Sequence, residues 1–392
     1  MVSRESEIDR NRKLLLGIGY WVQGLRCFPW MGVNFFLKDG LNMDPSTLQI
    51  LQNSANLPMV AKPFYGILSD SFYISGQHRV PYIAVGETGR KSTSSKNVKS
   101  SSSGGLQSFT WMASSIGGVL GNLIAGISIG QFSPRMMFLI FGILLCFQFL
   151  VTMFVSEDTL DLPKSPSNVG FKKQLSELMA ALQKPEIFYS IIWFALSYAV
   201  IPALTGTMFY YQTQHLNIES SLLGISKVFG QAAMLLWGVV YNRHLKSISG
   251  RKLIAVVQIS MAVFMISDFL FVKGVYKSIG IPDSLYVVVF SGLLEVLYFF
   301  KILPFNVLMA QLCPPGYEGS VMAFVMSAIA LAFIVSGYLG VALASLVGIT
   351  GDNFQGLPRG LLIQAACTIL PVFWVSYIPD DQKSSTTKRK ES

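Results

Sequence analysis

The run LLLGIGYWVQGLRCFPWMGVNFFL, residues 14–37, decides how the rest of the chain is interpreted. It is long and apolar enough to cross a bilayer as one helix, yet Arg26 lies near its middle. A guanidinium at that depth is costly unless an anion or a protein partner meets it. Side chains with polar or aromatic groups recur every three or four residues on one helical face, namely Tyr20, Gln23, Arg26, Trp30 and Asn34. We expect this face to line water or a protein partner.

The composition indicates a protein that crosses a membrane several times. Of the 392 residues 52% are hydrophobic and only 13% are charged, whereas about a quarter of the residues in soluble domains are charged. The apolar runs are continuous, which disfavours a β-barrel of short alternating strands. The length criterion predicts about ten helices in contact with the lipid bilayer, at residues 14–37, 47–69, 106–130, 136–155, 187–211, 220–241, 253–272, 284–309, 319–347 and 359–378. The predicted fold class is an all-α membrane protein.

Basic residues are concentrated in every second connection between the apolar runs. The formal net charge is +9, and bases such as Arg90, Lys172 and Arg251 fall in the connections that share a side with both termini. Cytoplasmic loops of membrane proteins carry such an excess of bases. The pattern predicts both termini on the cytoplasm-like side, and it accounts for the charge without a nucleic acid as partner.

The same runs divide the chain into four regions. An N-terminal helical half is predicted over 1–155 and a six-helix C-terminal half over 187–380. The central connection 156–186 contains a short amphipathic stretch at 168–184, which is either an interfacial helix or a linker. The last region, 381–392, is basic and polar, as expected of a disordered tail.

A short motif occurs once in each predicted half. A glycine ends an apolar run, a polar residue follows four positions later, and an arginine follows nine positions after that. The first copy is Gly66, Asp70 and Arg79, and the second is Gly238, Asn242 and Arg251. Carriers built from two related halves show internal repeats of this kind.

The first copy of the motif resembles the loop signature of the major facilitator superfamily. That resemblance implies a fold of two helical bundles, with Gly66, Asp70 and Arg79 forming a latch in one access state. The blocks KPFYGILSD at 62–70, ILPF at 302–305 and CPPGYEGS at 313–320 resemble, more closely, the plant branch of the folate-biopterin transporter family. The resemblance implies a multi-pass carrier of folates or pterins that works by alternating access.

One departure from that family lies at residues 87–105. This stretch is rich in serine and charge, has the composition of a disordered linker, and is too polar to span lipid. Family members are expected to have twelve helices, so the third and fourth helices have no counterpart here and about ten remain. Two hypotheses follow: an active carrier, or a non-transporting paralogue or splice form that acts as a partner or lacks a stable function.

Three charged residues within apolar runs are the main candidates for a binding site. Arg26 suits the anionic tail of a folate, because guanidinium and carboxylate pair in a bidentate geometry; pairing with Glu295 is an equally favoured alternative. Glu295, with Lys301 in the same run, is a candidate for exchanging a proton near neutral pH. We expect Gln23, Trp30 and Asn34 to complete the substrate-binding site.

Enzyme activity, cofactors and metals are not indicated by the sequence. The three histidines, His78, His215 and His244, all lie in connections and have no carboxylate at metal-ligand spacing. The plant-type resemblance implies a plastid envelope, whereas the mixed charges of residues 4–13 do not fit a transit peptide. The location is therefore left open between the plastid envelope and the plasma membrane.

Overall fold

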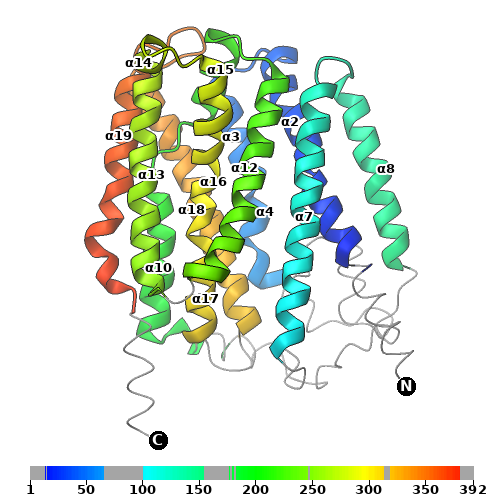
Figure 1. The fold of residues 1–392 in the computed structure, drawn as a ribbon, viewed down its shortest axis with the longest axis vertical. Helices are drawn as coiled ribbons and strands as arrows, with labels where there is room; N and C mark the ends of the chain where they lie inside the picture. The colour runs from blue at the N-terminus through cyan, green and yellow to red at the C-terminus, as the bar shows by residue number, and fades with distance from the viewer. Residues whose placement is uncertain are drawn as a thin grey trace, which may run out of the picture.

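The computed structural model describes residues 14, 16–65, 100–153, 176, 179–180, 182–245, 248–312 and 318–379. Most of these residues are helical, and none of them lies in a strand. The long helices stand side by side with their axes roughly aligned (Figure 1). The prediction of an all-α fold is therefore confirmed.

The helices follow the predicted apolar runs. The first half contributes residues 16–25, α2 (Cys27–Phe35), α3 (Pro45–Ser54), α4 (Leu57–Val60), α7 (Ser100–Ser128) and α8 (Pro134–Met153). The second half contributes α10 (Pro185–Ala199), α11 (Thr205–Tyr210), α12 (Ser220–Val240), α13 (Gly250–Val272), α14 (Val275–Ser278), α15 (Asp283–Tyr286), α16 (Gly292–Phe300), α17 (Ile302–Leu312), α18 (Glu318–Leu346) and α19 (Leu357–Ile369).

Six helical stretches of the described residues have the length and hydropathy needed to cross a membrane. They are Pro134–Val151, Ser220–Leu245, Gly250–Val272, Asp283–Met309, Val321–Leu346 and Leu357–Tyr377. The total of ten helices stays a prediction, as do the region boundaries, because residues 66–99 and 154–175 lie outside the described residues.

Prolines divide several of the spans, and neighbouring helices satisfy the backbone groups near the breaks. Pro304 cannot donate to the carbonyl oxygen of Phe300, and the indole Nε1 of Trp237 donates to that oxygen at 3.0 Å. Near Pro202 the chain between α10 and α11 is not helical, and the backbone N–H of Ala203 donates to the carbonyl of Ser336 in α18 at 3.1 Å. Broken helices at membrane depth persist when the surrounding protein supplies such partners.

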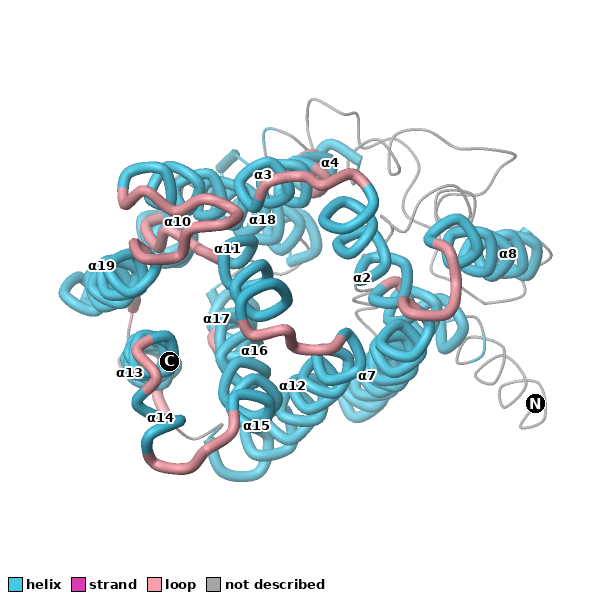
Figure 2. Tube along the Cα trace, turned by 90° about the horizontal axis from the view of Figure 1, so that it is seen from above, coloured by secondary structure: helices cyan, strands magenta, loops and turns pink. Residues whose placement is uncertain are grey.

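One glutamine joins the two halves at the break between α10 and α11. Gln49 of α3 is only 2% exposed, and its Nε2 donates to the carbonyls of Ala203 and Gly337 at 2.7 and 2.6 Å. Its Oε1 accepts the backbone N–H of Gly206 at 2.8 Å. Figure 2 shows α3 beside α11 and α18 when the bundle is seen from above.

Glycines bring two further helices of the two halves together. A Cβ on Gly126 of α7 would lie 3.3 Å from the Cα of Gly224 in α12. The backbones of α7 and α12 therefore run in close contact, as small residues permit in membrane bundles. The halves are thus joined along two seams, α3 with α11 and α18, and α7 with α12.

The two halves repeat one unusual backbone geometry. A π-helical turn covers Phe36–Gly40 in the first half and Tyr211–His215 in the second. Each turn leads into a Leu-Asn pair, and Asn42 and Asn217 have positive φ angles of 49° and 53°, which asparagine tolerates better than most residues. The same structure at equivalent points is what a fold of two related bundles requires. The first copy of the predicted loop motif, at 66–79, lies outside the described residues.

The helices that follow these two turns are α3 and α12, and their N-cap residues differ. Asp44 accepts hydrogen bonds from the backbone N–H groups of Ser46 and Thr47, both at 3.0 Å. Glu219, at the equivalent position before α12, makes no side-chain cap hydrogen bond. Burial of Asp44 opposes its charged form, but the hydrogen bonds from Thr47 and Ser46 outweigh it and hold the pKa of Asp44 below its ordinary value.

We predict that Asp44→Ala lowers the stability of the detergent-solubilised protein at neutral pH by about 1 kcal/mol, the usual value of an N-cap. Glu219→Ala should cost clearly less. Because the pKa of Asp44 is lowered on folding, its contribution is present above the unfolded value of about 4 and is lost as the pH falls through the folded value. Thermal melts from pH 7 down to pH 3 check this, and equal losses in the two variants would contradict it.

Candidate functional site

Arg26 lies at the bend of the first long helix. Residues 16–25 are helical, a turn follows at Arg26, and α2 begins at Cys27. Pro29 explains the bend, because it cannot donate to the carbonyl oxygen of Leu25. The Arg26 side chain is exposed, and no described residue forms an ion pair with it. The bend thus presents an available guanidinium in the middle of a membrane-length run.

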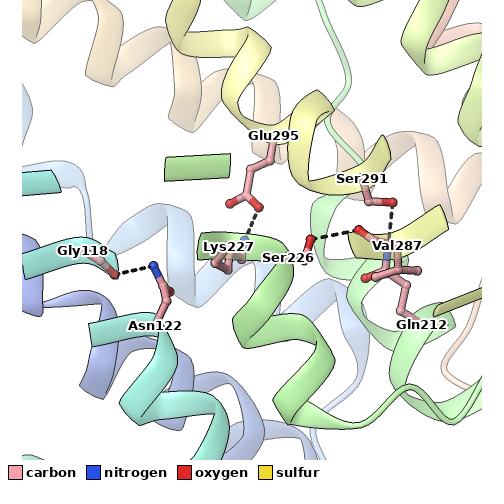
Figure 3. Close-up of polar contacts among 8 residues, drawn as sticks. All are labelled: Gly118, Asn122, Gln212, Ser226, Lys227, Val287, Ser291 and Glu295. Carbon is pink, nitrogen blue, oxygen red and sulfur yellow. Dashed lines mark hydrogen bonds and ion pairs between the residues drawn. The ribbon is translucent and has the colours of Figure 1, made fainter. Parts of the chain in front are cut away.

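An ion pair joins α12 and α16. Lys227 Nζ donates to Glu295 Oε2, as drawn in Figure 3. The two side chains are 41% and 50% exposed, although both residues lie well inside membrane-length spans, Ser220–Leu245 and Asp283–Met309. A charge pair with this exposure at such depth is expected to face a polar space and not the lipid.

Cys27 lies next to Arg26 in the sequence and near the Lys227–Glu295 pair. The charged groups of Lys227, Arg26 and Glu295 lie in the neighbourhood of its thiol. Asn122 of α7 lies in the same neighbourhood, and its amide donates to the carbonyl of Gly118 at 2.9 Å (Figure 3). We call Arg26, Cys27, Asn122, Lys227 and Glu295 the central cluster. It contains two cations and one anion, so it carries an excess positive charge suited to an anionic ligand.

Contacts between α12 and the start of α16 hold the pair in place. Ser226 Oγ donates to the carbonyl of Val287 at 2.9 Å (Figure 3). A Cβ on Gly292 would lie 2.7 Å from the carbonyl oxygen of Ser226, so the two backbones approach closely. Residues Val287–Ser291 form a π-helical turn directly before α16, a feature often found at functional sites.

The other site residues predicted along the first helix differ from one another in exposure. Trp30 is 41% exposed, whereas Gln23 and Asn34 are partly buried. Asn34 Oδ1 accepts a hydrogen bond of 2.5 Å from Gln52 Nε2 in α3. Asn34 therefore contributes to packing between α2 and α3.

Lys301 lies inside the second half and apart from the central cluster. Its side chain is 0% exposed, and Nζ donates to Ser197 Oγ at 2.8 Å and to Gln258 Oε1 at 2.7 Å. Nζ also lies 3.6 Å from the ring centroid of Tyr198. These contacts join α10, α13 and the α16–α17 junction and leave no face of the amine for a ligand. We therefore omit Lys301 from the binding site proposed below.

The ion pair of Glu295 differs from the Arg26–Glu295 pair considered from the sequence. Neither Arg26 nor Lys301 forms its ion pair; Lys227 does. Lys227 was visible as a charge in an apolar run, but nothing in the sequence signals which helix α12 packs against. The predicted latch residues Gly66, Asp70 and Arg79 lie outside the described residues, and within the described part of the chain no group of three or more possible metal ligands occurs.

Solved structures with the same fold are membrane transporters. The D-xylose–proton symporter matches 94% of this chain and 98% of its own, with a TM-score of 0.64 and 14% sequence identity. The nucleoside transporter NupG matches 93% of this chain and 99% of its own, with a TM-score of 0.64 and 15% identity. These likenesses establish the two-bundle fold of the major facilitator superfamily.

The family follows from the sequence. The model of the BT1 family matches residues 23–94 and 87–392, and the chain belongs to this family. Probable folate-biopterin transporter 7 of Arabidopsis thaliana is 53% identical over 435 residues, covering 98% of this chain and 97% of the relative. Probable folate-biopterin transporter 9, chloroplastic, of the same plant is 40% identical, covering 95% and 79%. The folate-biopterin transporter of Synechocystis sp. is 25% identical, covering 95% and 83%.

Two of these matches concern the departure from the family at residues 87–105. The family model matches in two segments, which meet at residues 87–94. The match to the 53% identical relative extends over 435 residues, more than the 392 of this chain. The relative therefore contains residues without a counterpart here.

We predict that Lys301→Ala destabilises the protein strongly, because it leaves a cavity and unpaired polar groups on Ser197 and Gln258. The expected loss is on the order of 3 kcal/mol. Lys227→Ala should cost less than about 1 kcal/mol, since that pair is half exposed. Thermal melts of the two variants in detergent measure the difference. A wild-type melting temperature for Lys301→Ala would contradict the structural role of this lysine.

Proposed function

We propose that the chain carries folates or pterins across a membrane by alternating access of its two helical halves. The names of its relatives support the substrate class, and the central cluster supports the position of the site. Its residues come from four helices of the two halves, α2, α7, α12 and α16, and its excess positive charge fits the glutamate tail of a folate. Midplane sites between repeats are usual in such carriers.

In this proposal the residues of the cluster have distinct roles. Arg26 binds a carboxylate of the substrate through paired N–H donors, and Trp30 offers an exposed aromatic face for the pterin ring. Gln23 and Asn34 border this region on the same helix. Glu295 takes up and releases the proton that drives uptake, and Gly66, Asp70 and Arg79 latch the halves in one access state.

The location belongs to the proposal as well. Two of the similar Arabidopsis thaliana proteins are described as chloroplastic, which supports the plastid envelope over the plasma membrane. Both termini are placed on the cytoplasm-like side, where the basic connections lie.

Uptake of labelled folate and biopterin into vesicles that contain the purified chain tests the proposal. We expect saturable uptake that an inward proton gradient increases. Arg26→Ala should reduce folate uptake by about tenfold or more, since a charged hydrogen bond contributes roughly 1.5–3 kcal/mol. Arg359→Ala, which removes an exposed arginine at the start of α19, is the matched control and should stay within about twofold of wild type.

The competing hypothesis, a non-transporting form, is supported by the residues that the chain lacks relative to its 53% identical relative. The same assay separates the two. Insertion of the relative's missing segment between residues 86 and 106 would restore uptake to a chain that has none alone. Uptake by the unmodified chain contradicts the non-transporting form, and uptake by neither version contradicts the proposed carrier.

A further inference from the structure

We infer that Lys227 is a second carboxylate-binding residue of this site and that Glu295 occupies it when no substrate is bound. The inference rests on the proposed function and deepens it: it assigns the preference for substrates with a carboxylate tail to a residue that the sequence left without a role. Glu295 acts as an internal substitute for the substrate's carboxylate, and substrate binding exchanges one carboxylate for the other on Lys227.

The first support is the contrast between Lys227 and Lys301, two lysines that lie within membrane-length spans of the second half. Lys301 has all its donors directed to fixed protein acceptors and is 0% exposed. Lys227 is 41% exposed, and among the described residues its ammonium group pairs with Glu295 alone. An ammonium group has three donors, so Lys227 keeps donors for a ligand where Lys301 does not.

The second support is the charge of the central cluster. Arg26 and Lys227 together present two cations, whereas Glu295 supplies one carboxylate. A glutamate tail carries two carboxylates. Arg26 and Lys227 can therefore bind both, provided that Glu295 releases the lysine. A ligand without carboxylates gains nothing from that release.

The third support is that the exchange needs only side-chain movement. The backbones of α12 and α16 are in close contact on both sides of Lys227. A Cβ on Gly292 would lie 2.7 Å from the carbonyl oxygen of Ser226, and a Cβ on Gly230 would lie 3.0 Å from the carbonyl oxygen of Gly292. The helices cannot slide past one another easily, whereas two half-exposed side chains can rotate apart. An ion pair whose two side chains are about half exposed is weak, so a ligand carboxylate can compete for the lysine.

The test compares two ligands that differ only in charge: folate, and folate whose two glutamyl carboxylates are converted to amides. Binding to the purified full chain is measured by competition against labelled folate. We expect Lys227→Gln to weaken folate binding by about tenfold, one charged contact, and to leave binding of the diamide within about twofold. Lys277→Gln, which removes the exposed lysine of the 3.7 Å pair with Asp283, is the matched control and should change neither ligand.

Glu295→Gln gives an outcome in the opposite direction. Removing the internal competitor should tighten folate binding by roughly threefold to tenfold, while proton-driven uptake falls because the proton-carrying group is gone. A purely structural ion pair would weaken binding in both variants. This second variant keeps the test decisive if Lys227→Gln does not fold.

Three results would overturn the inference. One is an equal loss of folate and diamide binding in Lys227→Gln, the second is equal affinity of the wild type for the two ligands, and the third is weaker folate binding in Glu295→Gln. If the wild-type chain binds neither folate nor biopterin, the proposed function fails, and this inference fails with it. Binding of both by the wild type, with no effect of Lys227→Gln, overturns the inference alone.

Discussion

The structure depends on one constraint: a charged or hydrogen-bonding group at the depth of the lipid must find its partner within the protein. Trp237 meets the carbonyl that Pro304 leaves free, and Gln49 meets backbone groups at the break between α10 and α11. Lys301 is enclosed by Ser197, Gln258 and Tyr198. The central cluster meets this rule only in part, because Arg26 and the Lys227–Glu295 pair remain accessible. An incompletely satisfied charge at this depth is the signature expected of a binding site.

The sequence predicted the helices well because their signal is local. Length and hydropathy alone identify an apolar span, and prolines lie at the breaks near Pro202 and Pro304. It also identified Arg26 and Glu295 as unusual charges. Their partners could not be predicted, since Lys227 and Glu295 are separated by 68 positions and meet only because α12 packs against α16. For the same reason, the sequence could not show that Lys301 contacts a glutamine. A lysine within an apolar run gives the same sequence pattern whether its partner is a ligand or a protein side chain.

The relation between the halves was only partly visible in the sequence. The motif of a glycine, a polar residue and an arginine suggested a repeat, but the clearest repeat in the structure is the π-helical turn followed by Asn42 or Asn217. The matching Leu-Asn-Met-Asp and Leu-Asn-Ile-Glu sequences that follow these turns could have indicated it. A repeat preserved in backbone geometry, while its caps have diverged to Asp44 and Glu219, explains why sequence comparison within one chain detects it poorly.

Cys27 allows a direct measurement of whether substrate binds at the central cluster. In a chain carrying Cys146→Ser, Cys313→Ser and Cys367→Ser, Cys27 is the remaining thiol, partly exposed and within reach of all three charges. The rate at which a small maleimide labels Cys27 should fall several-fold when folate saturates the protein. A labelling rate that folate leaves unchanged, in a preparation shown to bind folate, would contradict the placement of the site.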